Sequence, residues 1–250
     1  DIGDIVGVYG SVFKTRRGEL SVAVETWELL TKSLRPPPEK WHGLQDRETR
    51  YRQRYADLIA NPPVAAQLKA RSRLISAMRR YLEDLGFIEV ETPILQPLHG
   101  GAIARPFVTH HNALDTDLYL RIAPELYLKR LLVGGFDKVF EIGKSFRNEG
   151  ISLVHNPEFT MMELYWAYVD YNEIMELVEQ MIPVLAEEVT GSASVTVDDR
   201  DIDLAPPWPR ITIDTLLQEH LGMSLAALRG DLEAGQRALE ERGVQTDPTD

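Results

Sequence analysis

Alternating hydrophobic positions predict a β-hairpin at the start of the chain. Apolar and aromatic residues alternate or cluster over residues 4–15 and again over 19–30, and Arg16, Arg17 and Gly18 separate the two stretches. A short connection that contains glycine is typical of a hairpin turn. Two strands alone are barely stable. The pattern therefore indicates the last strands of a small β domain, whose earlier strands we expect before Asp1.

A proline-rich stretch then interrupts both kinds of periodicity. Residues 33–46 include three consecutive prolines, Pro36 to Pro38, which offer no backbone donors to a helix or a sheet. We place a linker over residues 36–62 and a second domain over 63–250.

Helical spacing of apolar residues predicts two helices in the second domain. The first covers residues 63–86 and ends at Gly86, which stands where a C-terminal cap belongs. The second covers 123–135, with Pro124 in its first turn and a Gly pair at its end. The apolar positions that carry the first helix are Leu68, Ile75, Met78, Leu82 and Leu85.

Extended segments alternate with these helices without a regular βαβ repeat. We expect an extended segment over 87–95 that Pro93 interrupts, strands over 117–122 and 138–142, and two strands that flank a loop at about 150–157. This mixture favours an α+β domain in which helices flank an antiparallel sheet.

The amino-acid composition indicates the cellular compartment of the protein but says little about its ligand. The chain of 250 residues has no Cys, which favours a reducing compartment and a cytoplasmic location, and no apolar run approaches the roughly 18 residues of a membrane span. The net charge of -12 argues against a generally basic nucleic-acid binder. Residues 1–110 nevertheless hold 16 Lys+Arg against 13 Asp+Glu. Such a surface either touches a polyanion or is simply solvated.

The stretch from Phe146 to Tyr165 concentrates charged and aromatic residues inside apolar sequence. If it forms two strands, Arg147 and Glu149 share a face of the first, and Phe159 and Glu163 share a face of the second. The other face of the second strand is mostly apolar and would pack against helices. We therefore expect one concavity on the sheet, lined by Glu125, Arg147, Glu149, Phe159 and Glu163.

These residue types suit a nucleotide together with an amino acid. Arginine is a planar fork for phosphate or carboxylate oxygens, an aromatic face stacks on a purine, and a glutamate accepts from an amine or an ammonium. His155 lies where it can reach outer phosphates. Two alternatives remain open: a surface hairpin laced with ion pairs, and a Glu125 that only stabilises the first turn of its helix.

The same residues resemble motif 2 of the class II aminoacyl-tRNA synthetases, and residues 86–95 resemble motif 1 of that family. The segments 100–107, 118–135 and 140–150 resemble the lysyl-tRNA synthetase branch, as do the hairpin, 34–44 and 50–59. The resemblance covers about residues 1–213. It implies that 1–35 end an OB-type β-barrel that binds the anticodon, and that 63–250 are an incomplete catalytic domain with a helical insertion from about 214.

The resemblance also implies roles for matching positions. Arg147 is the expected catalytic residue, binding the ATP α-phosphate and the reacting carboxylate, while Asn156 supports the loop. For ATP it further implies Glu149 at the adenine, His155 at the outer phosphates and Phe159 stacked on the ring. For lysine it implies Gly101 and Glu125 at the α-amino group, with Glu163 and Tyr165 lining the side-chain pocket.

The implied activity is that of a ligase: ATP-dependent activation of lysine and its transfer to tRNA(Lys), with Mg²⁺ assisting and a homodimer formed through residues 87–95. Two departures qualify this. Val154 replaces an arginine common in bacterial members. Motif 3 is not found, so we expect the Mg²⁺ ligands outside this chain and no adenylation by residues 1–250 alone. Alternatives are the synthetase-like part of a bifunctional lysyltransferase for membrane lipid, and a non-catalytic binding module.

Overall fold

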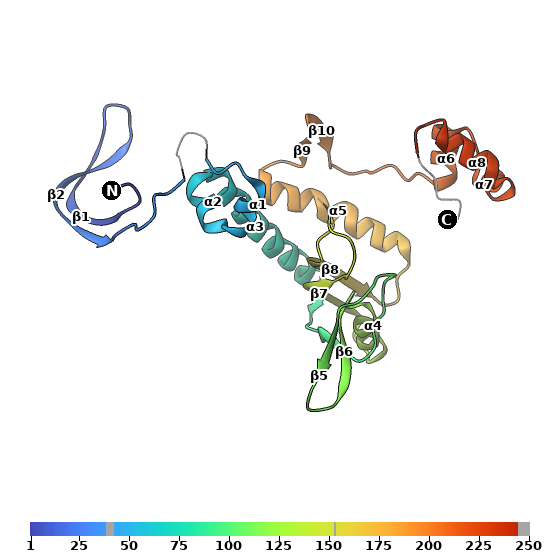
Figure 1. The fold of residues 1–250 in the computed structure, drawn as a ribbon. Helices are drawn as coiled ribbons and strands as arrows, with labels where there is room; N and C mark the ends of the chain where they lie inside the picture. The colour runs from blue at the N-terminus through green and yellow to red at the C-terminus, as the bar shows by residue number, and fades with distance from the viewer. Residues whose placement is uncertain (39–42, 153, 245–250) are drawn as a thin grey trace. The chain divides into compact units, whose positions relative to one another are not determined.

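The computed structural model describes residues 1–38, 43–152 and 154–244 (Figure 1). It consists of two compact units. The first comprises Asp1–Leu131 and Lys138–Tyr165, and the second comprises Leu132–Asp137 and Trp166–Asp250. The predicted linker range therefore lies inside the first unit.

The predicted N-terminal hairpin is confirmed. Strands β1 (Ile5–Lys14) and β2 (Leu20–Thr31) pair antiparallel, with Lys14 opposite Leu20 (Figure 1). Large apolar side chains such as Val8, Tyr9 and Trp27 remain exposed on it. Assignment of this hairpin to an OB-type barrel stays a prediction.

Helices occupy much of the range predicted as linker. Its described residues before 47 contain no helix or strand, and residues 39–42 lie outside the described residues. Two short helices follow, α1 (Arg47–Arg52) and α2 (Arg54–Ala60), and the side chain of Asp46 caps α1 by accepting from Thr49 N.

The long helix predicted over 63–86 is confirmed as α3 (Pro62–Asp84). Gly86 caps its C-terminal end as predicted: Gly86 N donates to Glu83 O and Phe87 N donates to Leu82 O. This is the hydrogen-bond pattern of a Schellman motif, and the accompanying apolar pair, Leu82 and Phe87, is buried.

Two three-stranded sheets build the rest of the first unit. One has the order β3-β7-β8, and the other has the order β4-β6-β5. Their bounds are β3 Ile88–Glu89, β4 Leu95–Gln96, β5 Val108–His111, β6 Thr116–Leu120, β7 Lys138–Phe146 and β8 Glu158–Trp166. The second sheet is antiparallel as predicted. In the first, the short strand β3 pairs parallel with β7, which the predicted antiparallel sheet did not include. A long connection separates β3 from β7, which permits parallel pairing.

The predicted division of the β7 region was also wrong. We predicted a strand over 138–142 and a second strand that carries Arg147 and Glu149. The structure has one continuous strand that ends at Phe146, so Arg147 and Glu149 lie beyond it. Arg147 N donates to Pro157 O, where the partner strand has no N–H to return. The chain then pairs elsewhere, as Asn148 N donates to Arg105 O at 2.8 Å.

The core of this unit gathers around β7 and α4 (Glu125–Val133), which confirms the second predicted helix. Its fully buried apolar side chains are Leu82, Ile122, Leu128, Val139 and Phe140. Since Val139 and Phe140 are neighbours on one strand, both faces of β7 are covered here.

The second unit contains elements that the sequence patterns did not predict. Helix α5 (Tyr171–Thr190) begins with a capping box between Asp170 and Glu173, and β9 (Ser194–Val197) pairs with β10 (Arg200–Asp203). Three helices follow instead of the one or two expected: α6 Ile213–Leu221, α7 Leu225–Gly230 and α8 Leu232–Glu240. Among the helices of the described chain, none is long and apolar enough to cross a membrane.

Candidate functional site

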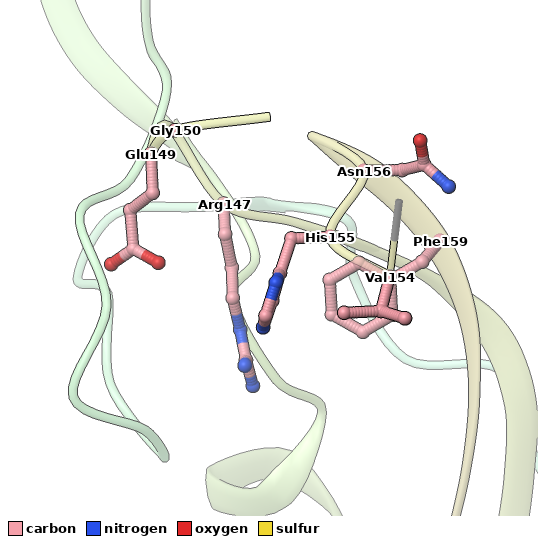
Figure 2. Close-up of a pocket in the computed structure, with 7 residues that line it drawn as sticks. All are labelled: Arg147, Glu149, Gly150, Val154, His155, Asn156 and Phe159. Atoms are coloured by element: carbon pink, nitrogen blue, oxygen red, sulfur yellow. The ribbon is translucent and has the colours of Figure 1, made fainter. Parts of the chain in front are cut away.

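A cavity of about 310 Å³ opens beside the loop between β7 and β8. Figure 2 shows Glu149 on one side of Arg147, with His155 and Phe159 on the other. The lining residues are Arg147, Glu149, Gly150, Val154, His155, Asn156 and Phe159. The four residues expected to bind ATP therefore line one cavity.

Arg147 has hydrogen-bonding capacity that the described residues do not use. Its guanidinium lies over the Phe159 ring, 5.1 Å from the centroid. Its Nε is buried and has no hydrogen-bond partner within the described structure, and the same holds for Ser145 Oγ two residues earlier. Buried donors are rarely left unpaired. The Nε of Arg147 is therefore free to donate to an acceptor bound in the cavity.

The loop opposite Arg147 is organised by the hydroxyl of Ser152. That oxygen accepts from the backbone N–H groups of Val154 and His155, and it lies 2.8 Å from His155 Nδ1. Ser152 N in turn donates to His155 O. The loop is thus held in a compact turn that presents the His155 ring to the cavity.

Glu149 and Asn156 also line the cavity, but Glu149 is hydrogen-bonded to the protein backbone and Asn156 does not face Arg147. One Glu149 oxygen accepts from Arg105 N at 3.2 Å, so this carboxylate also fastens the loop to the neighbouring segment. The Asn156 side chain points away from Arg147 (Figure 2). Val154, the departure from the family pattern, lines the cavity with an exposed side chain.

The residues expected to bind lysine form a second group. Tyr165 Oη donates to Glu163 Oε2 at 3.2 Å. Glu125 accepts from Lys129 Nζ at 2.5 Å, and that ammonium lies 5.8 Å from the Tyr165 ring centroid. Within the chain itself, an ammonium is thus held between a carboxylate and an aromatic face, which is the chemistry proposed for the substrate.

Burial and charge shift the titration of this group. Burial, supported by the nearby carboxylates of Glu125 and Glu141, raises the pKa of Glu163 despite the hydrogen bond from Tyr165. The pKa of Tyr165 is raised as well, chiefly by burial and then by the Glu163 charge. A cationic ligand beside Glu163 would offset the neighbouring carboxylate charges that raise its pKa.

Gly101 is fitted closely against Glu125. Its φ is +89°, and a Cβ at this position would lie 2.9 Å from Glu125 Cβ. A side chain here would be both strained and in collision. The glycine therefore lets the backbone approach Glu125.

Close enough to act on the pKa of Glu163 lies an ion pair that the sequence did not reveal. Arg121 and Glu141 are 1% and 4% exposed, and the Arg121 Nη1 donates to Glu141 Oε1. Arg121 also donates to Lys144 O and to both oxygens of Thr92, while Thr92 Oγ1 donates to Glu141 Oε2. A Cβ on Gly143 would overlap the guanidinium. Gly143 could have indicated this ion pair from the sequence, because a glycine in a strand often marks a place where another group packs closely against the backbone.

One face of the sheet carries both groups. Phe159 and Glu163 are four residues apart on β8 and so share a face, and Arg147 contacts Phe159. Of the five residues expected in one concavity, Arg147, Glu149 and Phe159 line the cavity, whereas Glu125 and Glu163 are not among its lining residues. Strand β8 therefore contributes to both groups, with Phe159 in the first and Glu163 and Tyr165 in the second.

The described residues contain no group of three or more His, Cys, Asp or Glu side chains placed to hold a metal ion.

Comparison with known proteins identifies the family. Residues 46–242 match the family described as tRNA synthetases class II (D, K and N), and the chain belongs to that family. Relatives named lysine–tRNA ligase include those of Pelotomaculum thermopropionicum (59% identity, 100% of this chain and 50% of the relative), Carboxydothermus hydrogenoformans (56%, 96% and 49%) and Clostridium perfringens (55%, 96% and 48%). The chain thus spans about half the length of these curated relatives.

Proposed function

We propose that the protein activates lysine with ATP and transfers the lysyl group to tRNA. The observation that carries this proposal is the pairing, on one sheet face, of a cavity that holds an arginine with unused donors and a group of carboxylates that already holds an ammonium. The names of the relatives support the same substrates.

In this mechanism the lysine carboxylate attacks the α-phosphorus of ATP in line and pyrophosphate leaves. Arg147 would hold oxygens of the α-phosphate and of the attacking carboxylate with its fork, which positions both reactants and offsets charge that develops in the transition state. Phe159 would support the adenine and His155 the outer phosphates. No side chain has to act as a nucleophile, and Mg²⁺ would add further charge neutralisation when bound.

On the amino-acid side, Glu125 would accept from the α-ammonium beside Gly101. The Glu163 carboxylate would accept hydrogen bonds from the side-chain ammonium, and the Tyr165 ring would lie beside it. The activated lysyl group would then pass to the 3′ end of tRNA(Lys). A cytoplasmic location remains part of this proposal.

The direct test is exchange of labelled pyrophosphate into ATP by the full-length protein with each amino acid in turn. We expect exchange with lysine and much less with arginine, whose planar head does not match a pocket for an ammonium. Charging of tRNA(Lys) would follow. Exchange that does not depend on lysine would contradict the proposal.

The raised pKa of Glu163 gives the lysine affinity a pH dependence. As pH falls through that raised pKa, Glu163 becomes neutral and loses its attraction for the ammonium, so the KM for lysine should rise. Glu163→Gln should raise KM about 10- to 100-fold at neutral pH, the range for losing a charged hydrogen bond, and should flatten the profile. A mutant profile as steep as that of the wild type would assign the titration to another group.

We also propose a symmetric contact between two copies through residues 87–95. Ile88 and Ile94 in this segment are exposed, and an extended apolar segment that Pro93 interrupts suits an interface. We expect the full-length protein to sediment as a dimer at micromolar concentration, and Ile94→Asp to shift it toward the monomer. A wild-type monomer under these conditions would rule this contact out.

A further inference from the structure

A second cavity, of about 280 Å³, lies between α1, α2 and α3 in the first unit and has no role in the proposed reaction. Its lining is basic and contains no carboxylate among the residues that form it. These residues are Arg47, Arg50, Tyr51, Arg54, Val64, Gln67 and Leu68.

Two of the three arginines share one carboxylate, that of Asp57. Arg50 Nε donates to Asp57 Oδ1 at 2.8 Å and Arg54 donates to Asp57 Oδ2, while the Asp57 side chain is 0% exposed. Within the described residues Arg47 pairs with no carboxylate. The nearby acid Glu48 pairs instead with Arg52, which does not line the cavity. The cavity therefore carries a formal charge of about +2.

Tyr51 holds two of these cations close together. The guanidinium of Arg47 lies 5.5 Å from its ring centroid, and that of Arg54 lies 5.2 Å away. Asp57 is itself fixed by Asn61, whose side-chain amide also donates to Leu44 O. Because the forks are fixed before any ligand arrives, an anion in the cavity would meet an ordered set of donors.

The basic lining continues along α3. A neighbouring hollow shares Leu68 with the cavity and is lined by Ala66, Leu68, Lys69, Ser72 and Arg73. A single small anion would need only the cavity, whereas a chain of phosphates can follow both hollows. Exposed Tyr55, next to Arg54, adds an aromatic face of the kind on which unpaired bases stack.

We propose that this cavity, together with the hollow beside it, binds the phosphate backbone of an RNA strand, with Arg47, Arg50 and Arg54 around one phosphate. The choice of RNA rests on the proposed function, in which tRNA is a substrate. The site itself is separate from the ATP cavity and from the lysine group.

The test compares three variants of the full-length protein. Arg47→Gln removes a cation that has no ion pair to lose, and Gln67→Glu adds a carboxylate to the lining. Arg71→Gln is the matched control, because Arg71 is exposed on α3 and lines neither hollow. Binding of a tRNA(Lys) transcript is titrated at several salt concentrations. Inorganic phosphate is titrated separately, and lysine-dependent pyrophosphate exchange is measured without RNA.

We expect Arg47→Gln to weaken RNA binding about three- to tenfold and to reduce the slope of log Kd against log salt by about one. Gln67→Glu should weaken RNA binding at least as much, and Arg71→Gln should change neither quantity. Pyrophosphate exchange should stay at the wild-type level in all three. RNA binding is measured without catalysis, so a failure of the proposed reaction would not be confused with a failure of this site.

Unchanged RNA affinity and salt slope in both cavity variants would overturn the inference. So would loss of phosphate binding in Arg47→Gln with RNA binding intact, since that result would identify a site for a free anion.

Discussion

Replacement of Arg147 by alanine is expected to lower lysine-dependent pyrophosphate exchange of the full-length protein by a factor of about 100 to 1000. The reason is the loss of a positioned charge at the reacting phosphate, where removal of one such donor costs about 3–4 kcal/mol. The unused, buried Nε of Arg147 supports this role, because it offers a hydrogen bond that the described residues do not take up.

Arg147→Lys distinguishes charge from geometry. A lysine keeps the charge but not the planar fork, and its stem cannot reproduce the contact with Phe159, so we expect severe impairment here too. Arg71→Ala, at an exposed position on α3, serves as the control. Near-normal exchange in either Arg147 variant would refute its assigned role.

Replacement of Arg121 by methionine is expected to destabilise the fold by about 3–5 kcal/mol, because it leaves the Glu141 charge buried without its partner. The carbonyl of Lys144 and the oxygens of Thr92 lose donors in the same step. The measurement is the urea midpoint of unfolding, followed alongside the KM for lysine, since Arg121 lies close enough to Glu163 to act on its pKa.

Two further variants test whether burial of the ion pair explains the loss of stability expected for Arg121→Met. Arg79→Met breaks the pair with Glu89, which is partly exposed, and should cost about 1 kcal/mol or less. The double change Arg121→Met with Glu141→Leu removes both charges and should recover part of the stability lost in the single variant. Equal midpoints for Arg121→Met and Arg79→Met would contradict this account.

Sequence patterns within single segments correctly predicted one hairpin and two helices. The hairpin around Gly18, the helix that ends at Gly86 and the helix after Pro124 follow from periodicity and turn chemistry within each segment, and all three are present. Helix α5 was missed although its first turn carries a capping box between Asp170 and Glu173, which is a readable sequence signal.

The sequence-based predictions were wrong or incomplete where contacts between distant segments determine strand ends, strand pairing and ion pairs. Pro157, opposite Arg147, is a readable signal for the end of the strand at Phe146, but the next residues pair with Arg105 about forty positions away, which no local pattern predicts. The parallel pairing of Ile88 with Val139 is equally non-local. The candidate ATP residues were nevertheless gathered correctly, since Arg147, His155 and Phe159 belong to one hairpin. The pair of Arg121 and Glu141 was missed because twenty residues separate its members.

The hydrogen bonds of Arg121 also bear on the order in which the molecule folds. They reach Thr92, Glu141 and Lys144, and the separations along the chain are 29, 20 and 23 residues. Contacts of such separation form only after long loops have closed, and their entropy cost must be met before they contribute stability. Helices α3 and α4 can begin to form early, from neighbours in sequence. We therefore expect this ion-pair network to form late in folding, when Thr92 and strand β7 are both brought to the guanidinium of Arg121.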